Sequence, residues 1–199
     1  NLYGATKLTS DKLFAAANNF KGKKNIKFSV VRYGNVMCSR GSVIPFFQSL
    51  SAEDDIPITD LNMTRFMISL DEGVDLVKIA FEDSLGGEIY VRKIPSMKVM
   101  DIAEAVTGRK DFKEIGIRLG EKIHEQMISA EDSEYTYEYS NYYKILPQIN
   151  DWAKDTKRIK NGTKVPSGFV YSSDNNSDWM SNEELNDWIE ANQKFIGNI

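Results

Sequence analysis

Tyr3 and Lys7 are two residues near the front of the chain whose types and spacing suggest acid–base chemistry. In a helix, residues four apart lie on one face, one turn from each other. A lysine ammonium beside a phenol favours the phenolate, and it therefore lowers the pKa of the tyrosine. Such a tyrosine can exchange a proton at neutral pH, which an ordinary phenol with a pKa of about 10 does poorly. A helix with an unrelated surface tyrosine and surface lysine gives the same pattern, so the spacing alone does not decide the function.

The residues around this pair predict a helix over residues 1–20, because leucine and alanine recur near the helical period without a proline. A polar connector follows, and the apolar, β-forming run 26–32 predicts a buried strand. Helix, short loop and strand are the alternation of a doubly wound parallel α/β sheet. Ligands bind at the carboxyl ends of the strands in such sheets, so we expect Asn35 to lie at a site.

Longer strings carry a resemblance to a known family. They are Tyr-Gly-Ala-Thr-Lys at 3–7, Val-Val-Arg-Tyr-Gly-Asn-Val at 30–36, Arg-Gly-Ser-Val-Ile-Pro-Phe-Phe at 40–47, Met-Thr-Arg-Phe at 63–66 and Ile-Arg-Leu-Gly-Glu-Lys-Ile-His-Glu at 117–125. With them the chain resembles the extended short-chain dehydrogenase/reductase family. Within that family it resembles the inverting UDP-N-acetylglucosamine 4,6-dehydratases, which open pseudaminic acid and surface glycan synthesis. The resemblance runs from residue 1 to about residue 179.

The resemblance implies the C-terminal part of a Rossmann fold plus a smaller α/β substrate-binding domain. Residues 1–50 would end the Rossmann domain, with the catalytic helix, a strand and a substrate loop. Residues 51–199 would be mostly substrate-binding domain, with some segments returning to the Rossmann sheet. The family's Gly-x-Gly-x-x-Gly turn is absent from the sequence. We therefore expect on the order of 130–140 further residues before this chain in the parent enzyme, by analogy with the family.

The implied reaction is a dehydration with NADP as cofactor, bound mainly by the N-terminal half. C4 of UDP-N-acetylglucosamine is oxidised, water is lost across C5–C6, and hydride returns to C6 with inversion at C5. Tyr3 would handle the proton of the C4 hydroxyl, and Lys7 would hydrogen-bond the nicotinamide ribose. Both would contact the cofactor, together with Val36.

The resemblance also implies a substrate site in several segments. Arg65 and Arg118 would bind the diphosphate, because guanidinium groups bind phosphate oxygens bidentately, although they could equally be unrelated surface arginines. Backbone groups of 57–59 would meet the uracil, and residues 171–175 would close over the nucleotide. The full set is Asn35, Arg40, Gly41, Ser42, Val43, Ile44, Pro57, Ile58, Thr59, Arg65, Arg118, Tyr171, Ser172, Ser173, Asp174 and Asn175.

Two other functions stay open. A UDP-sugar 4-epimerase of the same family would share Tyr3, Lys7 and the arginines, and an upstream Asp-Lys pair would distinguish the dehydratase from it. A nucleotide-sugar-binding module without activity is the alternative from another class, because the glycine-rich turn is absent.

Composition limits the partners. The 199 residues include 25 basic and 29 acidic side chains, a net charge of −4, which gives no footprint for nucleic acid. The single Cys38 fits a reducing compartment, and the single His124 cannot form a metal site by itself. The sequence has neither a signal peptide nor an apolar run of membrane length. We expect a cytoplasmic protein without a metal, which self-associates because the family packs the Tyr–Lys helix against a partner subunit.

Five further elements are expected. Residues 70–82 predict an amphipathic helix whose apolar face carries Leu70, Val74, Val77 and Phe81. Residues 119–128 predict a short helix, the tyrosines of 135–143 predict an antiparallel hairpin, and the polar stretch 150–167 predicts a mobile loop. Ser181 or Asn182 is expected to cap a last helix.

Overall fold

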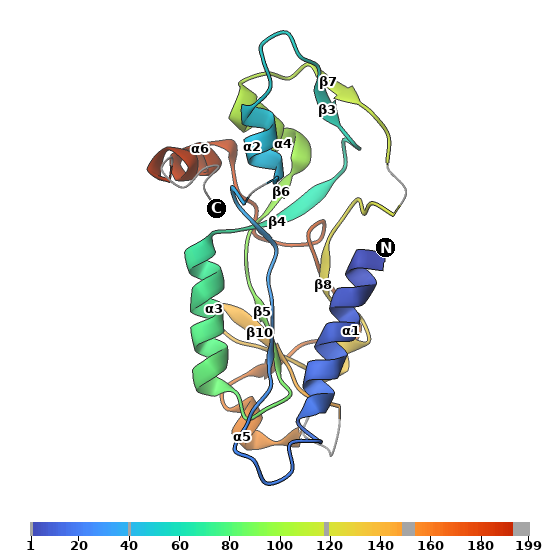
Figure 1. The fold of residues 1–199 in the computed structure, drawn as a ribbon, viewed down its shortest axis with the longest axis vertical. Helices are drawn as coiled ribbons and strands as arrows, with labels where there is room; N and C mark the ends of the chain where they lie inside the picture. The colour runs from blue at the N-terminus through green and yellow to red at the C-terminus, as the bar shows by residue number, and fades with distance from the viewer. Residues whose placement is uncertain (1, 40, 118–119, 149–153, 193–199) are drawn as a thin grey trace. The chain divides into compact units, whose positions relative to one another are not determined.

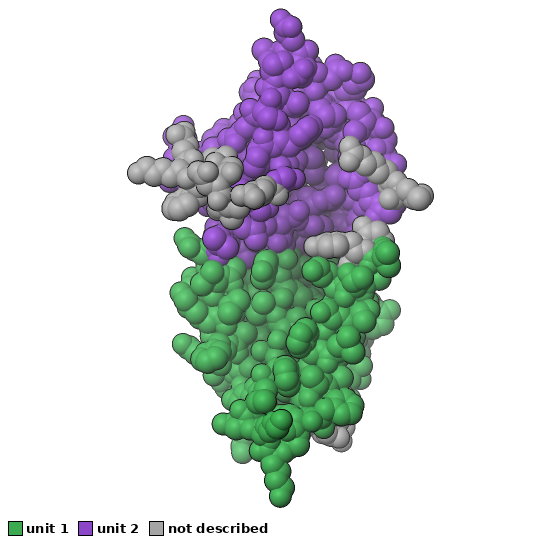
Figure 2. Space-filling view, viewed as in Figure 1, with its two compact units in different colours: residues 1–33, 71–93, 126–171 green, residues 34–70, 94–125, 172–199 purple. Residues whose placement is uncertain are grey.

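The computed structural model describes residues 2–39, 41–117, 120–148 and 154–192. The chain forms two compact units, coloured separately in Figure 2, and each is described by itself. Unit 1 comprises residues 1–33, 71–93 and 126–171, and unit 2 comprises residues 34–70, 94–125 and 172–199. Both units are therefore built from segments that lie far apart in the sequence (Figure 1).

Unit 1 contains a five-stranded sheet in the order β1-β5-β10-β9-β11. Its strands are β1 (Val30–Arg32), β5 (Ile89–Arg92), β10 (Tyr142–Ile145), β9 (Thr136–Glu138) and β11 (Thr163–Lys164). β1 and β5 are parallel, with Val31 opposite Tyr90, and the other neighbours are antiparallel. The hairpin expected over 135–143 is confirmed as β9 and β10. The strand β8 (Gln126–Ile128) and the short helix η1 (Asp132–Tyr135) precede it.

The predicted first helix is confirmed as α1 (Leu2–Ala17), and Asn18 follows its last residue. The Asn18 amide nitrogen donates to the carbonyl oxygens of Ala15 (3.1 Å) and Phe28 (2.8 Å), and the Phe28 N–H donates back to the Asn18 carbonyl (3.1 Å). Gly86 lies so close that an added Cβ would be 2.4 Å from Asn18 Oδ1. Asn18 therefore satisfies carbonyl groups at the end of α1 and ties the helix to the segment before β1.

The second long helix of unit 1, α3 (Leu70–Asp83), matches the predicted range but buries a different face. The apolar residues Val74, Val77 and Phe81 are exposed, Phe81 at 86%. The buried residues are Gly73, Leu76 and Ala80, and Leu76 and Ala80 pack against Tyr90 of β5. The contact of Leu76 and Ala80 with Tyr90, rather than the larger apolar residues, therefore determines which face of α3 is buried.

In its described residues, unit 2 contains two small sheets and three helices. One sheet has the order β2-β4-β6, with β2 (Asn35–Val36), β4 (Thr64–Ile68) and β6 (Ser96–Lys98), and the other pairs β3 (Ile56–Ile58) with β7 (Phe112–Glu114) in parallel. The helices are α2 (Val43–Gln48), α4 (Val99–Thr107) and α6 (Asn182–Ala191). Ser181 caps α6 in a capping box with Glu184, which confirms the predicted cap. The strand β12 (Tyr171–Ser172) spans the boundary between the units.

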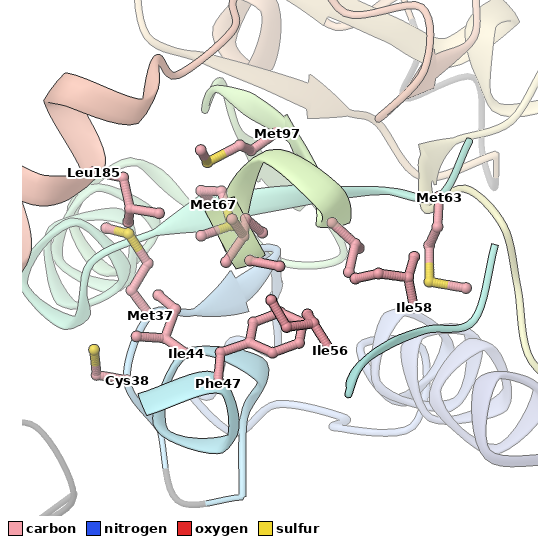
Figure 3. Packing of buried hydrophobic residues seen from close by; sticks show 13 residues of the cluster. Met37, Cys38, Ile44, Phe47, Ile56, Ile58, Met63, Met67, Met97 and Leu185 are labelled. Carbon is pink, nitrogen blue, oxygen red and sulfur yellow. The ribbon is translucent and has the colours of Figure 1, made fainter. Parts of the chain in front are cut away.

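The core of unit 2 is rich in methionine, as Figure 3 shows. Met37, Met67 and Met97 lie among Ile44 and Phe47, all of them buried. The side chains come from the loop after β2, from α2, from β4 and from β6, and they point toward one another. Unbranched methionine fills irregular gaps between such short elements.

Two expectations from the sequence are wrong. Residues 120–125 form turns rather than a helix, and β8 follows them, because the chain there bonds to β4: the Thr64 N–H donates to the Ile123 carbonyl (3.0 Å). The described part of 150–167 holds the helix α5 (Thr156–Ile159) and the strand β11. Arg158 of α5 is buried, donates to the Gly86 carbonyl (2.8 Å) and pairs with Glu88, so tertiary contacts order this polar stretch.

Candidate functional site

Unit 2 contains a cavity of about 420 Å³ that gathers residues from separate segments. Eight of the residues expected at the substrate site line it, together with Val36, which was expected at the cofactor: Asn35, Gly41, Ser42, Val43, Ile44, Pro57, Thr59 and Arg65. They come from β2, the following loop, α2, β3 and β4. A cavity of this volume with apolar walls and a few polar groups is typical of small-molecule sites.

The cavity also has lining residues that the sequence did not point to. They are Met37, Phe46, Phe47, Met63, Met67, Val99, Ile115 and Glu121. Most of them are apolar and belong to, or flank, the core of Figure 3. Strand pairing identifies Met67 as a lining residue, because it lies opposite Asn35 in the parallel pairing of β2 with β4. Sequence spacing cannot supply that register, because the strands belong to separate segments.

Arg65 stands at the cavity with its guanidinium already engaged by the chain. Nη1 donates to the carbonyl oxygens of Thr64 (2.7 Å) and Ile123 (2.9 Å), and Nη2 donates to the Lys122 carbonyl (3.0 Å). The arginine therefore holds the segment 122–123 against β4 and at the same time brings a fixed positive charge to the wall of the cavity. A fixed cation suits an anionic ligand group, such as a phosphate.

Asn35 lies beside the partly buried carboxylate of Glu125. With the Asn35 amide nitrogen toward Glu125, it donates to Oε1 (2.5 Å) and Oε2 (2.9 Å). The Phe66 N–H also donates to Glu125 Oε2 (3.0 Å). Burial raises the pKa of the Glu125 carboxyl, and the Phe66 N–H and the charges of Arg65 and Lys122 oppose that rise.

Thr64, His124 and Ser173 form a hydrogen-bonded cluster next to Glu125. The Thr64 hydroxyl lies 2.8 Å from His124 Nδ1 and 2.7 Å from the Ser173 hydroxyl, and both Thr64 and Ser173 are buried. The Glu125 N–H donates to the Ser173 hydroxyl (2.9 Å), and the Ser173 N–H donates to the Glu125 carbonyl (2.8 Å). His124 therefore has a supporting position, and Ser173 anchors the turn rather than lining the cavity.

The rest of the expected 171–175 segment is also absent from the cavity wall. The Ser172 hydroxyl donates to Asp174 (2.6 Å), which lowers the pKa of that carboxyl, and the Ser172 N–H donates to the Asn175 side chain (3.0 Å). Tyr171 belongs to unit 1, where its ring packs against Tyr143 at 5.1 Å. Ile58 is fully buried in the core of unit 2, so only its backbone could meet a ligand.

The loop between β2 and α2 presents one polar group without a partner. The Ser42 hydroxyl oxygen is buried and has no hydrogen bond within the part of the chain that the structure describes. Ser42 lines the cavity, so a ligand hydroxyl or phosphate would satisfy it. Cys38 in the same loop is buried, and burial raises the pKa of its thiol to about 11, which argues against a nucleophilic role.

Tyr3 and Lys7 lie in unit 1, in α1. The spacing puts them one helical turn apart, and Lys7 is exposed, whereas the described side chains do not include that of Tyr3. Arg40 and Arg118 lie outside the described residues. Across residues 2–39, 41–117, 120–148 and 154–192, no group of three histidine, cysteine or acidic side chains is placed to hold a metal ion. Nor does any helix in that part of the chain have the length and apolar character needed to cross a bilayer.

Comparison with known proteins bears on what the cavity does. Residues 1–147 match the family described as "Polysaccharide biosynthesis protein". The chain belongs to this family. Its fold is the mixed α/β fold of the extended short-chain dehydrogenase/reductases, as expected from the sequence. The X-ray structure of Pen from Bacillus thuringiensis superposes with a TM-score of 0.81 at 34% identity, covering 97% of this chain and 57% of that one.

Two curated relatives give the chain a chemical context. The chain is 54% identical over 202 residues to the UDP-N-acetylglucosamine 4,6-dehydratase (inverting) of Campylobacter jejuni, covering 98% of this chain. It is 39% identical over 150 residues to the UDP-glucose 4-epimerase of Rickettsia bellii, covering 73% of this chain and 44% of the epimerase. The chain spans 60% of the length of the dehydratase it matches. The resemblance to a dehydratase is therefore the higher in both identity and coverage.

Proposed function

We propose that the protein containing this chain is a C5-inverting UDP-N-acetylglucosamine 4,6-dehydratase that serves surface glycan synthesis. The observation that carries the proposal is the 54% identity to the Campylobacter jejuni dehydratase over 98% of this chain. The cavity supports it, because eight of the residues expected at the substrate site come together there from separate segments, with Val36 beside them.

In this proposal the cavity of unit 2 binds the sugar nucleotide. Arg65 supplies the fixed positive charge for the diphosphate, together with Arg118 and Arg40 from outside the described residues. The orphan hydroxyl of Ser42 and the amide of Asn35 supply polar contacts. Apolar side chains such as Met63 and Ile115 supply the flat walls against which a base or a sugar face packs.

The acid–base pair of this chain is Tyr3 with Lys7. The tyrosine takes the proton of the C4 hydroxyl, and the lysine ammonium favours its phenolate. A nicotinamide dinucleotide, NADP in our proposal, would accept hydride from C4 and return it to C6. Tyr3, Lys7 and Val36 would contact it, and Lys7 is exposed on α1.

Self-association is part of the proposal. Leu2, Leu8 and Leu13 of α1 are exposed, at 83%, 52% and 65%, on the helix that carries Tyr3 and Lys7. Apolar residues gathered on one helix are typical of a surface that another protein segment covers. We propose that a second copy of the protein covers them and that the enzyme works in the cytoplasm, since its single cysteine is free and buried.

The test uses the natural full-length protein and UDP-N-acetylglucosamine in D2O, with the sugar followed by NMR. We expect a 6-deoxy-4-keto sugar that carries deuterium at C5 with inverted configuration. A C4 epimer that keeps its C6 hydroxyl would replace the dehydratase with the epimerase, which the Rickettsia relatives make the second candidate. UDP binding without any turnover of the sugar would instead leave an inactive nucleotide-sugar-binding module.

A further inference from the structure

Hydrogen bonds hold Glu125 by both its backbone and its side chain. Its backbone N–H and carbonyl are both bonded to Ser173, at 2.9 and 2.8 Å, and Ser173 is completely buried. Its carboxylate accepts the Phe66 N–H of β4 at 3.0 Å. The carboxylate therefore cannot rotate without breaking its hydrogen bond with the Phe66 N–H of β4.

This fixed carboxylate decides which way the Asn35 amide faces. Both carboxylate oxygens are acceptors, so the amide group of Asn35 must turn its NH2 toward them, and in that orientation the nitrogen lies 2.5 Å from Oε1 and 2.9 Å from Oε2. The carbonyl oxygen of the amide lies on the opposite branch of the same group and therefore faces away from Glu125. Asn35 lines the cavity, so that oxygen remains as an acceptor for a ligand.

We propose that Glu125 is a positioning residue that holds the Asn35 amide oxygen as a hydrogen-bond acceptor for the sugar moiety of the nucleotide sugar. The inference rests on the proposed function for the identity of the ligand, but the orientation of the amide stands without it. An acceptor at this point binds a hydroxyl or N–H group and not a phosphate oxygen, which has no proton to donate. The comparison with UDP below distinguishes the donors of the hexosamine from those of the uridine.

Exchange of donors and acceptors tests this arrangement. In Glu125→Gln the glutamine amide has a single oxygen, which accepts the Phe66 N–H. Its NH2 group therefore faces Asn35, and the Asn35 amide must turn its carbonyl oxygen toward that NH2. The cavity then meets a donor instead of an acceptor. In Asn35→Asp two carboxylates face each other and repel. In the double variant the glutamine NH2 donates to one aspartate oxygen, and the other oxygen again faces the cavity as an acceptor.

The orientation is measured first, in the ligand-free full-length protein, from the 15N-labelled side-chain amide of Asn35 by NMR. We expect slow exchange and a shifted resonance in the wild type, both lost in Glu125→Gln. An Asn35 amide signal that does not respond to Glu125→Gln would overturn the positioning role, whatever the ligand is. Glu53→Gln, an exposed acidic residue of unit 2, is the matched control for loss of one negative charge.

Affinity is measured next, by calorimetry with UDP-N-acetylglucosamine and with UDP. Each single variant is expected to weaken binding of the sugar nucleotide roughly tenfold, while the affinity for UDP changes less than about twofold, and the double variant regains most of the loss. An equal loss for UDP, or no recovery in a double variant that melts like the wild type, would overturn the contact to the sugar. If the wild type binds no UDP-N-acetylglucosamine but the NMR result holds, the proposed function fails and the positioning of Asn35 stands.

Discussion

The guanidinium of Arg32 in β1 binds the carboxylate of Asp11 in α1, with Nε 2.7 Å from Oδ2. The same guanidinium donates from Nη1 to the Met127 carbonyl (2.8 Å) and to Asp132 (3.2 Å). Arg32, Asp11 and Asp132 are largely buried, with side-chain exposures of 15%, 17% and 9%. One arginine therefore joins the helix that carries Tyr3 and Lys7 to the sheet, to β8 and to the short helix η1 after it.

Removal of this arginine should destabilise the protein strongly. Arg32→Met leaves Asp11 and Asp132 without their shared cation, and we expect the free energy of unfolding to fall by about 3 kcal/mol, as for other buried pairs that lose one partner. Urea unfolding of the full-length protein measures it. Lys23→Ala, an exposed loop residue, should change the stability by less than about 0.5 kcal/mol. Equal effects of the two substitutions would contradict a structural role of Arg32.

The buried pair of Lys144 and Asp83 predicts a dependence of stability on pH. Burial raises the pKa of the Asp83 carboxyl, but hydrogen bonds from Lys144 (2.6 Å), Lys160 and Tyr90 (2.7 Å) outweigh burial, and the pKa lies below its usual value. A carboxyl with a lowered pKa in the folded state stabilises the fold above its unfolded pKa of about 4, and that stability is lost as the pH falls through the folded pKa.

Asp83→Asn should therefore reduce stability at pH 7, because Lys144 is only 1% exposed and loses its counter-charge. The variant should also lose less further stability than the wild type between pH 5 and pH 3, which urea titrations at several pH values would show. Asp75→Asn is the control, since Asp75 pairs with Lys78 at the surface and should have almost no effect. A parallel decline of wild type and Asp83→Asn on acidification would argue against this origin.

Gly34 allows β2 to approach β4, and a methyl group there has no space. An added Cβ would lie 2.5 Å from Phe66 Cβ and 2.9 Å from the Phe66 carbonyl oxygen. We expect Gly34→Ala to cost about 1–3 kcal/mol of stability and to weaken sugar-nucleotide binding, because Asn35 moves with the strand. Gly73→Ala should instead raise the stability, since an added Cβ in α3 has nothing within 4 Å and alanine favours a helix over glycine by about 1 kcal/mol. Thermal denaturation and calorimetry measure both variants.

Arg65 should respond even to a conservative change. Arg65→Lys keeps the charge but not the planar fork that holds the carbonyls of Lys122 and Ile123 and faces the cavity. We expect the affinity for UDP to fall roughly tenfold. Arg109 pairs with Asp111 and does not line the cavity, so Arg109→Lys should leave UDP binding unchanged. Unchanged UDP affinity in Arg65→Lys would remove Arg65 from the diphosphate site.

Tyr3 and Lys7 should affect turnover rather than substrate binding. Tyr3→Phe removes the group that takes the proton, and we expect kcat to fall by about 10²–10⁴-fold with little change in UDP-N-acetylglucosamine affinity. Lys7→Met should also lower kcat, and it should move the rising, acid-side limb that the Tyr3 phenolate gives the pH–rate profile toward higher pH. Lys12→Met, on the same helix and 54% exposed, is the control. Unaltered kcat in Tyr3→Phe would exclude the proposed acid–base role.

Local chemistry was readable from the sequence. Spacing and composition predicted α1 and α3, the tyrosine-rich hairpin and the capped start of α6, because propensity, alternation and capping involve neighbours in the chain. Residues named from strings shared with a family also line the cavity between β2 and β4, and their roles stay predictions. The conformation of the segment 120–125 was not predicted, since its helix-like sequence gives way to bonds with Arg65 and Thr64 on a distant strand.

The sequence by itself determined which residue types could act and on which elements they lie: a tyrosine and a lysine one turn apart, and an arginine on a strand. Only the tertiary structure decided their surroundings. It packed Leu76 and Ala80 of α3 against Tyr90 of the sheet and ordered α5 through Arg158. It also brought Glu125 against Asn35 and so fixed the direction of that amide. Side-chain orientation depends on partners that are distant in sequence, and no local pattern encodes the contacts that select them.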